Sequence, residues 1–191
     1  LHISFNNFKL RHICVFSIKK LMKSKKNLVL LGMMGSGKSI IGNLISKKLK
    51  LKFIDIDNAI EKEANMNIAE IFSKKGENFF RNLEEKITIK SLKSSNGVIS
   101  LGGGGFVNEK IRKEVITNNF SFWLNWNNTT LLNRIKNSHK RPIAFYSNDQ
   151  ELVELIEKRK KIYSKADFEI NCNKLSKTEI VKKIIILYED N

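Results

Sequence analysis

The sequence predicts an α/β fold of three layers, in which helices cover both faces of a five-stranded parallel sheet. Two observations support this prediction. Short apolar runs alternate along the chain with longer amphipathic stretches, which is the order expected of strands and crossover helices. The 191 residues are 41 % hydrophobic and 28 % charged, and these values are typical of one globular domain.

The predicted strands are short and buried. The first is a compact apolar run, NLVLL, that leads directly into a glycine-rich segment. Another, GVISL, also ends in a run of glycines. The five strands are expected at residues 27–31, 51–55, 97–101, 120–124 and 168–171.

Helical patterns fill the intervals between these strands. In residues 38–49, for example, apolar side chains recur at the spacing of one helix face. Further helices are expected at residues 68–75, 77–94 and 178–188. The polar stretch 137–150 holds the single proline and little apolar material, so we predict a mobile lid there.

Residues 1–24 differ from the rest of the chain. This segment is basic and interleaves hydrophobic residues with lysine and arginine, and no acidic residue precedes Asp55. Leu1 stands where an initiator methionine is expected, whereas Met22 lies just before the first strand. We favour a translated upstream extension with the true start at Met22; a transit peptide and an amphipathic surface helix are the alternatives. Residues 25–191 then form one domain.

Composition argues against several classes of protein. Cys14 and Cys172 are the only cysteines and form no C-x-x-C pair, which disfavours a disulfide framework or a zinc site. No apolar run approaches the roughly 18 residues of a membrane span. The net charge of +16 invites a nucleic-acid interpretation, but the lysines are scattered rather than gathered with aromatic residues. We expect a soluble, cytoplasmic monomer with neither a nucleic-acid nor a membrane partner.

Residues 32–39 (GMMGSGKS) match the phosphate-binding pattern G-x-x-x-x-G-K-[ST] at every fixed position. The motif follows a predicted strand and opens a predicted helix, so an ordinary glycine turn is disfavoured. Inward-turned backbone N–H groups and the helix N-terminus hold phosphate, while Lys38 reaches the β- and γ-phosphates and Ser39 offers a hydroxyl to Mg²⁺. The sequence therefore predicts a P-loop kinase fold. The expected nucleotide contacts from this segment are Gly35, Ser36, Gly37, Lys38, Ser39 and Ile40.

Two carboxylates, Asp55 and Asp57, come at the end of the second predicted strand. Because the carboxyl ends of parallel strands meet at one edge of the sheet, we expect both to face the bound phosphates. A carboxylate there can hold the water shell of a metal or accept a proton from an attacking hydroxyl. Capping of the following helix by Asp57 is the alternative, and it can coexist with either role.

Beyond these motifs, the sequence resembles the shikimate kinase family over about residues 26–188. The P-loop is followed by DID at 55–57, like the family's D-x-D. Residues 68–85 contain IAEIF and GENFFRNLEE, which are similar to the family's I-x-E-I-F and G-E-x-x-F-R-x-x-E-E. SLGGG at 100–104 looks like its triple-glycine substrate loop, and RPI at 141–143 like the R-P-L of its lid. Arg159, Tyr163 and Ala166 resemble a helix motif of the family, whereas Ile40 departs from its usual threonine.

The resemblance implies roles for individual residues. Shikimate would contact Asp57, Arg81, Gly102, Gly103, Gly104 and Arg159. The two arginines would bind its carboxylate, braced by Glu84, because planar guanidinium groups match a carboxylate. Arg134 would lie against the adenine of ATP, and Arg141 of the lid would close over the transferring phosphoryl group. Lys38, Asp57 and Arg141 would be the catalytic residues, while Ser39, and Asp55 through water, would hold Mg²⁺. Taken alone, Arg81 beside Glu84 and Glu85 favours a surface ion pair of a helix, and it is the ordered set of motifs that favours the binding role.

The predicted reaction is transfer of the γ-phosphoryl group of ATP to the 3-hydroxyl of shikimate, giving 3-phosphoshikimate for the biosynthesis of chorismate and the aromatic amino acids. Another small-molecule P-loop kinase, of the gluconate or nucleoside-monophosphate type, is the nearest alternative. A basic P-loop protein that binds nucleic acid and uses ATP as a switch is an alternative from another class, but it needs a basic stripe with aromatic platforms that the sequence lacks.

Overall fold

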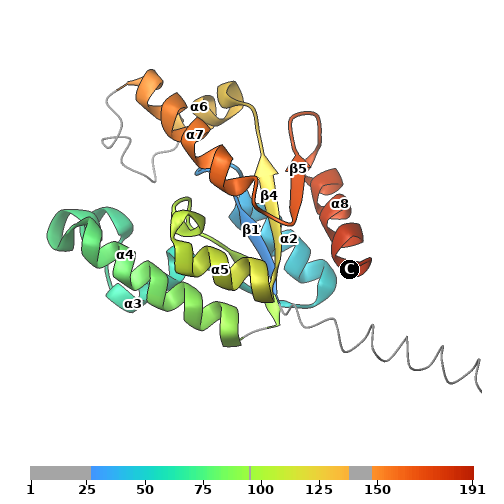
Figure 1. Ribbon diagram of the computed structural model, residues 1–191, viewed down its shortest axis with the longest axis horizontal. Helices are drawn as coiled ribbons and strands as arrows, with labels where there is room; N and C mark the ends of the chain where they lie inside the picture. Colours follow the sequence, from blue (N-terminus) through green and yellow to red (C-terminus); the bar gives the residue numbers. More distant parts are fainter. Residues whose placement is uncertain (1–26, 95, 138–147) are drawn as a thin grey trace, which may run out of the picture.

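The computed structural model describes residues 27–94, 96–137 and 148–191 (Figure 1). The segment predicted as an N-terminal extension, residues 1–24, lies outside the described residues. So does most of the predicted lid, including Arg141.

The central sheet holds five parallel strands within the described residues, as predicted. They are β1 (Leu28–Leu31), β2 (Lys52–Asp55), β3 (Gly97–Ser100), β4 (Phe120–Asn125) and β5 (Phe168–Asn171). Their spatial order is β2-β3-β1-β4-β5, and every neighbouring pair is parallel. β1 and β2 each begin one residue later than predicted, whereas β3 ends one residue earlier and β4 one residue later. β1 lies in the middle of the sheet. The chain passes from β1 to β2 on one side and later from β3 to β4 on the other. The carboxyl end of β1 therefore lies at a switch point of the sheet, where α/β proteins bind ligands.

Helices cover both faces of the sheet. On one face, α2 (Lys38–Leu49) packs against α8 (Lys177–Glu189), and on the other α4 (Ile68–Ser94) packs against α5 (Glu109–Asn118) (Figure 1). The remaining helices lie near the ends of the strands. They are α3 (Ile56–Ala64), the short 3-10 helix η1 (Gly105–Val107), α6 (Asn128–Lys136) and α7 (Asp149–Tyr163).

The two helices predicted at residues 68–75 and 77–94 are the two parts of α4. Gly76 separates them with a non-helical backbone, φ 80° and ψ 169°. Glycine adopts this conformation without the steric cost of a Cβ, so the chain changes direction here. The bend brings the second part of α4, which carries Arg81 and Glu84, to the edge of the sheet where β3 ends.

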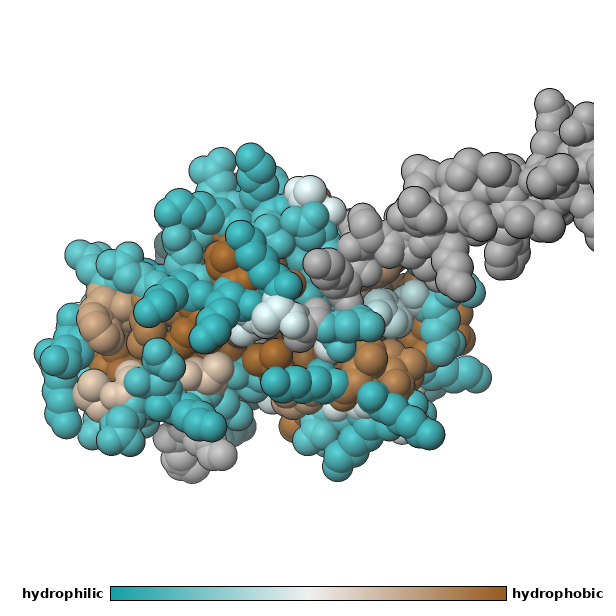
Figure 2. Space-filling model, turned by 90° about the horizontal axis from the view of Figure 1, so that it is seen from below, coloured by the Kyte–Doolittle hydropathy of each residue, from teal (hydrophilic) through white to brown (hydrophobic). Residues whose placement is uncertain are grey.

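The core consists of the strands and the helix faces that cover them. All four residues of β1 and of β3 are buried, as expected of central strands covered on both faces. Buried Asn27, just before β1, donates to the carbonyl of Leu92 and accepts from the N–H of Gly97. On the face in Figure 2 hydrophilic residues cover most of the surface, with hydrophobic ones showing between them. Within the described ranges, none of the helices combines the length and hydrophobicity that a membrane span requires.

Candidate active site

The predicted P-loop connects β1 to α2. Gly35 and Gly37 have φ values of 78° and 89°, a region that favours glycine, and this backbone turns the loop around the N-terminus of α2. Lys38 is buried, and its Nζ donates to the carbonyls of Gly32 at 3.0 Å and Met33 at 3.1 Å. The loop thus holds its own lysine over the place where phosphate would lie.

Ser39 and Asp55 meet beside the loop. The Ser39 hydroxyl donates to Asp55 Oδ2 at 2.5 Å, although β2 and β1 are not neighbours in the sheet. Asp55 is also the N-cap of α3, since its Oδ1 accepts from the N–H of Asn58 at 3.3 Å. The alternative that Asp57 caps this helix is therefore wrong, because Asp57 already lies in the first turn and its side chain can serve elsewhere. Ser39 and Asp55 present a hydroxyl and a carboxylate oxygen together, which suits Mg²⁺, an ion that keeps most of its waters.

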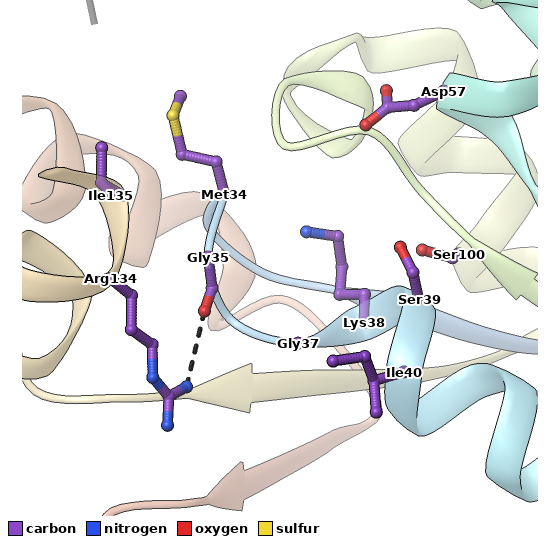
Figure 3. A pocket seen from close by; sticks show the side chains of 10 residues that line it. All are labelled: Met34, Gly35, Gly37, Lys38, Ser39, Ile40, Asp57, Ser100, Arg134 and Ile135. Atoms are coloured by element: carbon purple, nitrogen blue, oxygen red, sulfur yellow. Dashed lines mark hydrogen bonds between the residues drawn. The ribbon is translucent and has the colours of Figure 1, made fainter. Parts of the chain in front are cut away.

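A cavity of about 430 Å³ opens at this edge of the sheet (Figure 3). The Lys38 amino group extends into the space bounded by Met34 and Asp57, and Asp57 faces the loop from the opposite side. Ser100, the last residue of β3, also lines the cavity and was not predicted from the sequence as a site residue. Its place at the end of a strand, two residues before the glycine run, is the signal that could have identified it. The cavity is lined by Met34, Gly35, Gly37, Lys38, Ser39, Ile40, Asp57, Ser100, Arg134 and Ile135.

The glycine run after β3 is in contact with the side chains predicted to bind the acceptor. A Cβ on Gly102 would lie 2.7 Å from both Asp57 Oδ1 and Glu84 Oε1, and one on Gly104 would lie 2.6 Å from Arg81 Nη1. A Cβ on Gly103 would lie 3.6 Å from Arg159 Nη1. The distances at Gly102 and Gly104 are too short for a side chain unless a neighbour moves, whereas at Gly103 the tightest contact is with the Met34 backbone N at 3.3 Å. None of the three glycines has a positive φ, so at Gly102 and Gly104 it is the closeness of the neighbouring side chains, and not the backbone conformation, that favours glycine.

Arg81 and Glu84 form a partly buried ion pair. Arg81 Nη1 lies 2.8 Å from Glu84 Oε2, and Arg81 also pairs with Glu77 at 3.1 Å. Glu85, the other predicted partner, instead bonds Lys110 and Asn108. Burial raises the pKa of Glu84 above its ordinary value, against the opposing effect of Arg81. Burial lowers the pKa of Arg81, but the two carboxylates outweigh it and the net shift is upward, so the guanidinium stays charged.

Arg159 and Tyr163 connect α7 to the same site. Arg159 Nη1 lies 3.6 Å from the sulfur of Met33 in the phosphate loop. The buried Tyr163 hydroxyl donates to the carbonyl of Gly103 at 2.5 Å. One helical turn of α7 therefore fixes the glycine loop and directs an arginine toward it. The sequence pattern identified both positions, but only the structure shows what Tyr163 contacts.

A second cavity, of about 400 Å³, lies on the other side of the phosphate loop. Arg134 of α6 lines both cavities, and its guanidinium lies 3.8 Å from the centre of the Trp126 ring. The opposite wall comes from the turn between β5 and α8 and from the start of α8, where the family resemblance places contacts with the adenine but sequence reasoning assigned none to an individual residue. Its lining includes Ile40, Trp126, Arg134, Leu175, Ser176, Lys177 and Ile180. Trp126 was also missed, because one aromatic residue after a strand is usually part of the core.

Comparison with known proteins identifies the family. A sequence model described as shikimate kinase matches residues 34–189. The chain belongs to the shikimate kinase family. Shikimate kinase of Persephonella marina is 43 % identical over 161 residues, covering 84 % of this chain and 97 % of its own length. Shikimate kinase of Bartonella quintana is 40 % identical over 179 residues, covering 92 % of this chain and 85 % of its own length.

Solved structures agree with this assignment. A shikimate kinase from Acinetobacter baumannii in complex with shikimate matches with a TM-score of 0.82 at 27 % identity, over 90 % of this chain and 97 % of that one. Shikimate kinase from Aquifex aeolicus matches with a TM-score of 0.77 at 36 % identity, over 86 % and 97 %. The predicted P-loop kinase fold is thereby confirmed. A deoxyadenosine kinase of M. mycoides, at 15 % identity and a TM-score of 0.62, shares the fold alone.

Within the described residues, no group of three or more histidine, cysteine, aspartate or glutamate side chains is placed to hold a metal ion. A P-loop magnesium site needs no such cluster, because phosphate oxygens and water supply most of the ligands. The hydroxyl of Ser39 with Asp55 behind it therefore fits Mg²⁺ bound together with a nucleotide.

Proposed function

We propose that this enzyme transfers the γ-phosphoryl group of ATP to the 3-hydroxyl of shikimate, giving ADP and 3-phosphoshikimate. One observation carries the assignment of the acceptor: the glycine loop of residues 102–104 lies against Asp57, Arg81 and Arg159 at once. Two guanidinium groups beside a carboxylate and a tightly packed backbone suit a small hydroxylated acid better than a nucleotide. Membership of the shikimate kinase family supports the same assignment.

In the proposed reaction, Arg81 and Arg159 bind the carboxylate of shikimate and fix its ring against the glycine loop. Asp57 hydrogen-bonds the ring hydroxyls and accepts the proton as the 3-hydroxyl oxygen attacks the γ-phosphorus. The bond from that phosphorus to the bridging oxygen breaks, and ADP leaves. Lys38 and the N–H groups of the loop stabilise the negative charge of the phosphates. Catalysis therefore comes mainly from positioning and electrostatic stabilisation.

We also propose that ATP binds as its magnesium complex, with Ser39 as a direct ligand and Asp55 acting through water. Mg²⁺ there would neutralise charge on the β- and γ-phosphate oxygens. Arg141 would close over the transferred group, but it lies outside the described residues. The enzyme is further proposed to act as a cytoplasmic monomer without a nucleic-acid partner.

A coupled assay of ADP release tests the acceptor. Shikimate, quinate, gluconate and AMP are offered separately with MgATP, and release of ADP is expected with shikimate. Release with AMP alone would overturn the assignment. Arg81→Ala is expected to raise the KM for shikimate, and Arg81→Lys, which keeps the charge but loses the planar fork, should restore only part of the affinity. An unchanged KM in Arg81→Ala would contradict the role given to this residue.

A further inference from the structure

The Trp126 side chain lines the second cavity and contacts the phosphate loop, whose residues line both cavities. It directly follows β4 and is 9 % exposed. Its Nε1–H donates to the carbonyl of Ser36 in the loop at 3.0 Å. The guanidinium carbon of Arg134 lies 3.8 Å from its ring centre. One side chain therefore contacts the phosphate loop through its edge and the arginine of the second cavity through its face.

Both contacts are made by groups that have few alternatives for fixing their position. Arg134 is exposed, and its hydrogen bond to the carbonyl of Gly35 is long at 3.4 Å. An exposed arginine loses considerable side-chain entropy when it is held in one orientation, and a stacked aromatic face offsets part of that loss. The Ser36 carbonyl lies between two glycines that permit several backbone conformations, so a fixed donor on it selects one of them.

The geometry points to Trp126 as a positioning residue for the nucleotide, a role that rests on the proposed function. Its N–H holds the phosphate loop in the binding conformation. Its ring holds the Arg134 guanidinium flat, so that the free face of the guanidinium can stack on the nucleobase. Because a single rigid indole makes both contacts, the distance between the phosphate site and the base site is fixed before the nucleotide arrives. Preorganisation of this kind lowers the entropic cost of binding.

The two contacts of Trp126, with the phosphate loop and with Arg134, can be tested separately with two ligands. ADP extends over both cavities, whereas inorganic pyrophosphate reaches only the phosphate loop. Calorimetric titration of each, in the presence of Mg²⁺, gives two Kd values whose ratio reports the contribution of the base site. Trp126→Phe removes the N–H but keeps an aromatic face. It should weaken both ligands by a common factor of about two- to tenfold and leave the ratio unchanged.

Trp126→Leu removes the aromatic face as well, so it should also reduce the preference for ADP over pyrophosphate by about two- to fivefold. Arg134→Lys keeps the charge but loses the planar face, and should reduce the preference similarly without weakening pyrophosphate. In the double variant Trp126→Leu/Arg134→Lys, the two reductions in the preference for ADP should not add, because both substitutions remove the same stacking contact. Arg134 is on the surface, so this arm gives a result even if Trp126→Leu does not fold.

Trp123→Phe is the matched control, since it is the same substitution three residues earlier in the chain and outside both cavities. It should leave both Kd values unchanged and makes Trp126 the single tryptophan of the chain. The fluorescence of that variant should change more with MgADP than with pyrophosphate. An unchanged ratio in both Trp126→Leu and Arg134→Lys would overturn the inference and leave the proposed reaction standing. A wild-type chain that binds neither ligand would overturn both.

Discussion

Substitution of Gly104 by alanine should damage acceptor binding while leaving the fold intact. The backbone at Gly104 has φ −99° and ψ −15°, which alanine adopts without strain. The new methyl group would lie 2.6 Å from Arg81 Nη1 and 3.3 Å from its Cζ. Ordinary contact begins near 3.4 Å, so the guanidinium must move by about 0.8 Å. The clash involves the far end of a flexible side chain, which can yield without displacing any backbone.

The movement affects the hydrogen bond of 2.8 Å between Arg81 and Glu84 and the position of the guanidinium that would bind the carboxylate of shikimate. Hydrogen bonds to charged groups contribute about 1.5–3 kcal/mol. Because the Arg81 side chain is 38 % exposed, solvent screening places the loss at the lower end of that range. We therefore expect the KM for shikimate to rise about tenfold, with the KM for ATP and the melting temperature nearly unchanged.

Gly105→Ala is the matched control for this experiment. Its Cβ would meet Glu84 Oε1 at 3.6 Å and Leu101 Cβ at 3.8 Å, both ordinary van der Waals distances, and its φ is not positive. Steady-state kinetics with each substrate varied in turn should separate the two variants. A Gly104→Ala enzyme with the wild-type KM for shikimate would refute the reasoning, as would equal effects of the two substitutions.

Three further substitutions test other parts of the site. Lys38→Ala should lower kcat at least about hundredfold, because it removes the cation held over the phosphates, while circular dichroism stays that of the wild type; normal turnover would contradict this. Asp55→Asn keeps an oxygen that can cap α3 but loses the charge beside Ser39, so the Mg²⁺ concentration for half-maximal activity should rise about tenfold; an unchanged Mg²⁺ titration would count against it. Burial raises the pKa of the Cys172 thiol to about 12, so unfolding releases a proton in alkaline solution and stability is lost as pH rises from about 9 to 12. The wild type should lose up to about 1.4 kcal/mol per pH unit more than Cys172→Val in urea unfolding over this window, and parallel curves would disprove it.

The phosphate loop was predictable from the sequence because its chemistry is local. The positive φ values of Gly35 and Gly37 and the position of Lys38 at the start of a helix depend on neighbours in the chain. The acceptor site was predictable in another way, through the resemblance of several ordered motifs to one family. Those motifs placed Asp57, Arg81 and Arg159, which the structure brings to a single glycine loop.

The contacts of Trp126 and Tyr163 were not predictable, because each joins segments far apart in the chain. The Trp126 indole reaches a carbonyl 90 residues away in sequence, and the Tyr163 hydroxyl reaches one 60 residues away. An aromatic residue near a strand or helix end carries the same local pattern whether it fills the core or holds a functional loop. The alternative that Asp57 caps α3 was wrong for a related reason, since the exact start of a helix depends on tertiary packing.

By itself, the sequence determined the alternation of strands and helices, the parallel sheet, the phosphate loop and the family. Hydrophobic periodicity and short motifs are properties of neighbouring residues, so they can be recognised from the amino-acid sequence without a structure. Only the tertiary structure decided the strand order β2-β3-β1-β4-β5, the pairing of Ser39 in α2 with Asp55 at the end of β2, and the wall of the second cavity. These depend on which surfaces pack together, and packing is settled by the whole chain at once.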